Sequence, residues 1–137
     1  MQLHTLFDNV TVKTSFNLVN ANSTQNGSSF DTLQYRRAGF VFSYVTGAAT
    51  TANFQVQDSP DNSVWTNVTG ATLVTPIAAG TASSEQTVNI DLAKRQRYIR
   101  AQLICTGTNG QCTGTFLLTQ DQYAGVSPAQ DVAPLTV

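Results

Sequence analysis

Residues 54–68, with the sequence FQVQDSPDNSVWTNV, decide the fold of this chain. In both halves the side chains alternate in character with the two-residue period of a β-strand, as Phe54 and Val56 do with the glutamines beside them. The segment between the halves, DSPDNS, is typical of a turn, because proline fixes φ and Asp and Asn tolerate left-handed backbone. We therefore predict a β-hairpin with a loop of medium length.

Trp65, the one tryptophan of the chain, lies in the second half of this hairpin. A ring of that size is a natural anchor for a small core, and the flanking Val64 and Val68 favour this interpretation. The alternative is a sugar-stacking platform, because a short strand can turn its tryptophan to either face. The full predicted core is Phe40, Phe42, Phe54, Val56, Trp65, Val88, Ile90, Ile99, Leu103, Phe116 and Leu118.

The composition limits the classes of protein to which this chain can belong. The chain has 137 residues, enough for one domain, and 11% of them are charged, well below the usual share of about 25%. Its polar residues are mostly Thr, Ser, Asn and Gln, which favour strands and turns. The net charge of −1 does not support a nucleic-acid partner, and no stretch approaches the apolar length of a membrane span. The first residues do not resemble a signal peptide, so we expect synthesis in a host cytoplasm.

Alternation recurs along the chain at intervals typical of an all-β protein. We predict strands at 10–20, 38–45, 87–92, 98–105 and 113–120 besides the hairpin, with 38–45 central because it is apolar on both faces. Residues 20–31 are predicted to be a polar surface loop, or an arm that orders on a partner. The fold class is therefore an antiparallel β-sandwich, jelly-roll or immunoglobulin-like, at residues 1–122. Residues 123–137 form an extended C-terminal arm, since Pro128 and Pro134 exclude it from a sheet interior.

Groups that perform catalysis are scarce in this sequence. His4 is the one histidine and lies near a terminus, which disfavours a Ser-His-Asp or Cys-His arrangement. Asp58 and Asp61 share a turn, but a calcium loop needs more oxygen ligands, and turn chemistry accounts for both. There is no phosphate-binding glycine loop. We expect no enzyme activity, no cofactor and no metal.

Two further groups of residues are candidate sites. Cys105 and Cys112 bracket a short loop, and a hairpin there would place them opposite each other at a distance that a disulfide can bridge. A reducing cytoplasm argues against the bond, whereas a virion or cell surface permits it. The basic residues Lys94, Arg95, Arg97 and Arg100 are either a solvated turn or a docking surface for an acidic protein.

The segment QDSPDNSVWTNVTGA resembles a pattern of small structural proteins of tailed bacteriophages, in which a strand ends in a Ser-Asp turn and resumes with an aromatic residue, Thr and Val. The later segment KRQRYIRAQLICTGTNG is similar to the charged turn, Tyr-Ile-Arg strand and Gly-Thr turn of the same proteins. The resemblance implies a capsid decoration (cement) or related head protein, a β-sandwich or jelly roll that is often trimeric on the capsid. By this analogy Trp65, Tyr98 and Ile99 are fold residues. The cysteine pair and the Asn/Ser-rich stretch 20–31 depart from the pattern.

On this resemblance we expect a homotrimer at the capsid surface of a virion, bound to the major capsid protein. We also expect the arm to reach an adjacent subunit or the shell, rather than to fray or fold back on its own sandwich, through Val132, Pro134, Leu135 and Val137. One alternative is a carbohydrate-binding module, since discoidin-like lectin domains share a Ser-x-Asp-x-x-x-Trp hairpin similar to residues 59–65. The other is a tail or fibre component of the same virion.

Overall fold

The hairpin predicted at residues 54–68 is formed by β4 (Thr51–Ser59) and β5 (Thr66–Thr72), which pair antiparallel across the loop 60–65. The structure is a computed structural model that describes residues 10–45, 51–78, 84–107, 110–120 and 135–136. The remaining elements are β1 (Val10–Ala21), β2 (Gln25–Asp31), β3 (Arg37–Val45), β6 (Ser84–Asp91), the short 3-10 helix η1 (Leu92–Lys94), β7 (Tyr98–Thr106), β8 (Gly110–Thr119) and β9 (Leu135–Thr136).

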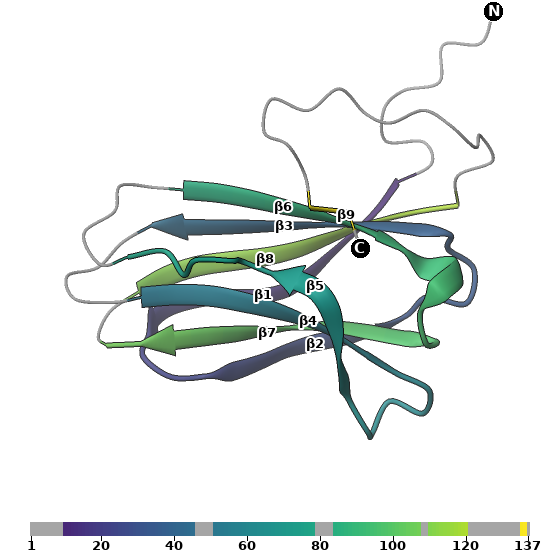
Figure 1. Ribbon diagram of the computed structural model, residues 1–137, viewed down its shortest axis with the longest axis horizontal. Coiled ribbons are helices and arrows are strands. Elements are labelled where there is room, and N and C mark those ends of the chain that lie inside the picture. Colours follow the sequence, from purple (N-terminus) through teal and green to yellow (C-terminus); the bar gives the residue numbers. More distant parts are fainter. Residues whose placement is uncertain (1–9, 46–50, 79–83, 108–109, 121–134, 137) are drawn as a thin grey trace, which may run out of the picture.

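The first eight strands form nested antiparallel pairs: β1 with β8, β2 with β7, β3 with β6 and β4 with β5. Two more pairings, β3 with β8 and β4 with β7, roll this long ribbon into two layers, which Figure 1 shows stacked on each other. Sheet A has the order β1-β8-β3-β6-β9, and sheet B has the order β2-β7-β4-β5. The predicted β-sandwich is confirmed, and its strand order is that of a jelly roll rather than an immunoglobulin-like fold.

The core lies between the two sheets and is centred on aromatic rings. The Phe40 ring lies 4.7 Å from that of Phe116 and 4.9 Å from that of Phe54, measured between centroids. β3 lies between β8 and β6 at the centre of sheet A, as its apolar character predicts. Every predicted core residue other than Trp65 is buried: Phe40, Phe42, Phe54, Val56, Val88, Ile90, Ile99, Leu103, Phe116 and Leu118.

The prediction that Trp65 anchors the core is wrong. β5 begins at Thr66, so Trp65 lies on the loop, half-buried, and the neighbouring Val64 is 66% exposed. The loop continues further than the alternation indicates because the Asp61 carboxylate accepts hydrogen bonds from the backbone N–H groups of Ser63 and Val64, at 2.9 and 3.0 Å. These bonds hold the chain in a turn up to the residue before the tryptophan.

Residues 20–31, predicted to be a surface loop, instead contain the end of β1 and all of β2. β2 has no apolar alternation and is held by its backbone ladder with β7 and by packing against β1. A Cβ atom at Gly27 would clash with the Ser15 hydroxyl and lie 2.7 Å from the Ala101 carbonyl oxygen. Glycine is therefore required here for the close approach of three strands, not for a turn.

Candidate functional site: the charged end of the sandwich

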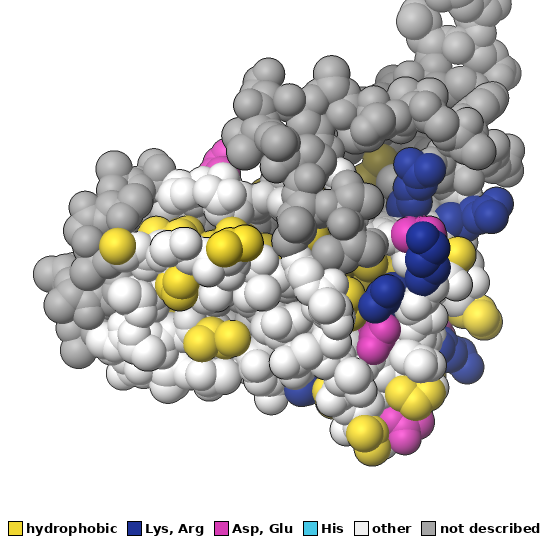
Figure 2. Space-filling model, in the orientation of Figure 1, with side chains coloured by type: hydrophobic (Ala, Val, Ile, Leu, Met, Phe, Trp, Pro, Cys, Tyr) yellow, Lys and Arg dark blue, Asp and Glu magenta, His cyan; other side chains and the backbone are white. Residues whose placement is uncertain are grey.

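Three connections gather at one end of the sandwich, because consecutive strands alternate in direction: 32–36 between β2 and β3, 60–65 between β4 and β5, and 92–97 between β6 and β7 (Figure 1). Six of the seven Lys and Arg residues of the chain lie on these connections or within the first three residues of the strand that follows: Arg36, Arg37, Lys94, Arg95, Arg97 and Arg100. Lys13 lies on β1 opposite Phe116, away from these connections. Figure 2 shows most of the dark blue side chains gathered at this end. We call this region the charged end.

The predicted basic turn thus becomes part of a larger cluster. Arg36 and Arg37 were not predicted to belong to this cluster, because they lie far from Lys94–Arg100 in the sequence. The pairing of β3 with β6 places Arg37 opposite Asp91 and so brings them to the same end. Among the described residues, four aspartates lie at the charged end: Asp31, Asp58, Asp61 and Asp91. Glu85 lies toward the other end of β6. These aspartates form ion pairs with the basic residues or accept hydrogen bonds from loop backbone N–H groups.

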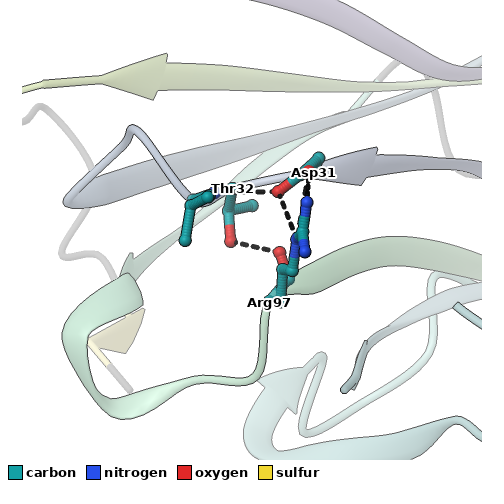
Figure 3. Close-up of polar contacts among 4 residues, drawn as sticks. Asp31, Thr32 and Arg97 are labelled. Atoms are coloured by element: carbon teal, nitrogen blue, oxygen red, sulfur yellow. Dashed lines mark hydrogen bonds and ion pairs between the residues drawn. The ribbon is translucent and has the colours of Figure 1, made fainter. Parts of the chain in front are cut away.

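Arg97 ties the β6–β7 connection to the end of β2 (Figure 3). Its Nε donates to both carboxylate oxygens of Asp31, to Oδ1 at 3.2 Å and to Oδ2 at 3.1 Å, and its Nη2 donates to Oδ2 at 2.7 Å. The guanidinium also lies 5.2 Å from the centroid of the Tyr98 ring. The Arg97 hydrogen bonds lower the pKa of Asp31. The Arg97 carbonyl also accepts from the backbone N–H and the hydroxyl of Thr32, at 2.8 and 2.7 Å. Arg97 therefore fixes a loop junction.

Arg95 and Lys94 also have partners within the chain. Arg95 Nη1 lies 4.0 Å from the buried Asp58, whose carboxylate accepts from the Gln96 backbone N–H at 3.2 Å. Lys94 lies 3.7 Å from Asp91, and the Asp91 carboxylate accepts from the Ala93 backbone N–H as the N-cap of η1. The Lys94 pair is largely exposed, so it leaves that ammonium group accessible to a partner.

Arg100 is placed differently from the other basic residues. It lies on β7 within sheet B, opposite Ser29 on β2 and Gln57 on β4, and alternates with the buried Ile99 and Ala101. Its guanidinium lies over the Trp65 ring at 4.3 Å, so the tryptophan that the sequence assigned to the core packs on the outer face of the sheet. The aromatic-over-cation contact is favourable and fixes both side chains.

Asp58 and Asp61 do not converge on a shared site. Asp58 faces the β6–β7 connection, whereas the Asp61 carboxylate accepts from backbone N–H groups of its own loop, which lowers its pKa. Among the residues that the structure describes, no three His, Cys, Asp or Glu side chains lie close enough to hold a metal ion. His4 lies outside the described residues.

Cys105 and Cys112 are not ladder partners, because β7 belongs to sheet B and β8 to sheet A. Cys105 lies opposite Ala52, and Cys112 lies opposite Leu18 and Tyr44. Both are buried thiols in the structure, and burial raises the pKa of Cys105 and raises that of Cys112 to about 12. The hairpin geometry on which the disulfide was predicted is therefore wrong, and the bond itself stays a prediction.

The last described residues lie on the edge of sheet A. β9 pairs with β6 in parallel, with Leu135 opposite Val88 and Thr136 opposite Asn89. An edge position is consistent with the prolines that precede it. The other predicted contact residues of the arm, Val132, Pro134 and Val137, lie outside the described residues.

No protein-family model and no curated protein sequence matches this chain. Among solved structures, it is similar to the SPBc2 prophage-derived protein YomS (13% identity, TM-score 0.52), over 85% of this chain and 98% of YomS. It is also similar to the PBSX exported protein XepA (15%, 0.58), over 90% of this chain and 41% of XepA. A third similar structure is the VP2 subviral particle of infectious bursal disease virus (10%, 0.52), over 80% of this chain and 32% of that chain. At these identities the likeness shows the fold alone.

Within the described part of the chain, no helix has the length and apolar character needed to cross a membrane.

Proposed function

We propose that this chain is a non-enzymatic structural protein of a bacteriophage virion, a capsid decoration or cement protein that binds the shell of major capsid protein and stabilises it. The observation that carries the proposal is the segregation of charge: six of the seven Lys and Arg residues of the chain lie at one end of the jelly roll. A protein that docks in one orientation on an acidic shell needs this kind of asymmetry, because electrostatic complementarity steers the encounter and fixes the register.

Two further observations support a structural role. A prophage-derived protein and a viral particle protein have the same fold, and the sequence resembles small bacteriophage head proteins. The cysteines have buried side chains with raised pKa values, the opposite of what an enzyme nucleophile requires. Fold alone does not imply function, so the charge distribution carries the argument and the likeness adds to it.

The proposal includes a homotrimer on the capsid surface, in which the arm holds a neighbouring subunit or the shell through Val132, Pro134, Leu135 and Val137. In the structure Leu135 and Thr136 pair with β6 of their own chain, as in the fold-back alternative, and this pairing shows that the edge of β6 accepts an extended strand. A strand from a neighbour would be bound by the same backbone groups. A stiff, proline-containing segment loses little conformational entropy when it docks.

Co-sedimentation with purified empty heads and, separately, with purified tails tests the proposed function. We expect saturable binding to heads that weakens as salt rises, and no binding to tails. Failure to bind heads would contradict the proposal, and binding to tails alone would favour the tail or fibre alternative. Light scattering of the free and head-bound protein tests the trimer, and monomers on the head would exclude it.

The role of the arm is tested by deleting residues 128–137. We expect the melting temperature of the free protein to change little, because the two residues of β9 add few contacts to the sandwich. Head binding or trimerisation should weaken at least about tenfold, equivalent to about 1.4 kcal/mol. Head binding at the original affinity would show that the arm is not a clamp, and the charged end would then carry the contact alone.

A carbohydrate-binding module is the second candidate, because Trp65 lies outside the core. Its ring packs on the outer face of sheet B, which carries amide side chains. On that face the Gln102 side-chain nitrogen donates to the Asn26 side-chain oxygen at 2.8 Å. Arg100 covers one face of the ring, which leaves less of it for stacking on a sugar. Glycan-array signals that disappear in Trp65→Ala would support this candidate, whereas head binding without any glycan signal would contradict it.

A further inference from the structure

Arg100 lies on the outer face of sheet B, on β7, one of the two inner strands of that sheet. Its row across the sheet contains Ser29 on β2, Gln57 on β4 and Asn67 on β5. These neighbours are neutral hydroxyl and amide side chains, so Arg100 is the one charged residue of this row. It is half-buried there, and burial lowers its pKa because the cation loses contact with water.

The guanidinium of Arg100 is held in a single orientation. The Trp65 ring supports its plane at 4.3 Å. Its Nε donates to the Gln57 side-chain oxygen at 2.9 Å, and the Gln57 amide nitrogen donates in turn to the Asn67 side-chain oxygen at 2.8 Å. A guanidinium fixed in this way loses little conformational freedom when it binds a ligand.

The two terminal nitrogens of Arg100 remain available. Among the described residues, neither has a hydrogen-bond or ion-pair partner, and neither is a buried atom left without one, so both reach solvent. This distinguishes Arg100 from Arg97, which has Asp31 as its partner, and from Arg95, which lies beside Asp58. Arg100 is thus an oriented cation with no carboxylate of its own.

Apolar surface lies next to this cation. The Trp65 ring stacks on the guanidinium, and the residue before it in the loop 60–65, Val64, is 66% exposed. Interfaces are dominated by Arg and Trp anchors of this kind, surrounded by polar groups. The nearby aspartates do not compete for it, because Asp31 binds Arg97 and Asp61 binds its own loop.

We propose that Arg100 and Trp65 form a binding site for a carboxylate on an acidic segment of the docking partner. The paired terminal N–H groups of a guanidinium match the two oxygens of a carboxylate, and the excess of basic over acidic side chains among the described residues of the charged end supplies complementary attraction. This inference rests on the proposed docking function and narrows it: of the four basic residues predicted as contacts, Arg100 is the anchor.

Trp65 provides the readout, because it is the one tryptophan of the chain and its emission reports directly on this site. Titration with a hexaglutamate peptide at low salt should change the emission saturably, and a Gly-Ser peptide of the same length should not. Arg100→Gln should weaken peptide binding at least about tenfold. Arg100→Lys should also weaken it, because a lysine ammonium cannot form two parallel hydrogen bonds.

Arg36→Gln is the matched control, since it removes the same charge from an exposed position at the same end. We expect it to change peptide affinity less than about threefold. Far-UV circular dichroism should show that each variant is folded. Equal loss in Arg36→Gln and Arg100→Gln, or no peptide effect on Trp65, would overturn the proposal. Binding of a short oligothymidylate without binding of the peptide would overturn it as well.

The same variants in the head-binding assay separate this inference from the proposed function. If Arg100→Gln binds heads as tightly as the unmodified protein, the anchor is refuted and the docking function stands. If the unmodified protein does not bind heads but binds hexaglutamate through Arg100, the docking function is refuted and the carboxylate site stands.

Discussion

At the scale of the residue, Asp61 and Trp65 show how one loop sets the character of a surface. The Asp61 carboxylate holds the backbone of the loop 60–65 in a turn, and that turn ends where Trp65 meets Arg100. Trp65 is two residues before Asn67, which lies on the outer face of sheet B, and three before the buried Val68, so strand alternation itself directs Trp65 away from the core.

Phe40→Ala and Trp65→Ala should differ strongly in stability. Phe40 is fully buried against Phe116 and Phe54, and its truncation should cost about 3–5 kcal/mol. Trp65 contributes mainly its stacking on Arg100, so its truncation should cost about 1–2 kcal/mol. Urea unfolding followed by far-UV circular dichroism measures both changes in stability. A cost for Trp65→Ala as large as that for Phe40→Ala would show that Trp65 is a core residue.

Asp61 should make part of the stability depend on pH. Its carboxylate accepts from Val64 and Ser63, which lowers its folded pKa below the value of about 3.9 in the unfolded chain. The stabilisation is therefore complete above that value and is lost as the pH falls below it. The stability difference between the unmodified protein and Asp61→Ala should be largest near neutral pH and shrink below about pH 4.

The control for this pH dependence is Asp61→Asn, which retains an oxygen acceptor but does not titrate. The stability difference between Asp61→Asn and Asp61→Ala should not change with pH. A constant difference between the unmodified protein and Asp61→Ala across the acid range would show that the carboxylate is not the capping group.

At the scale of the element, β8 is the strand that both sheet order and core packing depend on. It lies between β1 and β3, and its Gly114 faces the aromatic centre of the core. A Cβ atom there would lie 2.5 Å from Cζ of Phe16 and 2.7 Å from Cζ of Phe40. The glycine therefore provides the space that two aromatic rings occupy.

Gly114→Ala should destabilise the protein by about 1–3 kcal/mol, because rings packed in a core cannot move aside without strain. Gly39→Ala on the neighbouring β3 is the control, since its added Cβ would meet Asn89 and Leu117 at ordinary distances of 3.7 and 3.9 Å. We expect that substitution to be neutral or slightly stabilising. Chemical denaturation of both variants checks the contrast, and equal effects would contradict it.

At the scale of the whole molecule, the nested pairing makes the fold depend on contacts between distant parts of the chain. Val10 at the start of β1 lies opposite Thr119 at the end of β8, so sheet A closes only when both ends of the sandwich are present. The same closure brings Cys105 and Cys112 into the interior from opposite sheets. Burial, and then the two cysteines, raise the pKa of Tyr44.

The two thiols should be protected in the folded protein. Because the thiolate is the reactive form and burial raises the pKa of both groups, alkylation by iodoacetamide at pH 8 should be slow until the protein is unfolded. Both should then react quickly in guanidinium chloride. Rapid alkylation of the folded protein would contradict their burial, and an intact mass about two daltons lower than that of the reduced protein would show the disulfide instead.

The sequence by itself determined the all-β class, the hairpin of β4 and β5, the central place of β3 and nearly all of the core. These features follow from alternation, because a strand between solvent and a core must change character at every residue. Tertiary structure alone decided the jelly-roll order, the strand β2, the separation of the cysteines and the place of Trp65 beside Arg100. Each of these depends on which strand lies beside which, and that choice is made by contacts between residues far apart in the chain, where local pattern carries no signal.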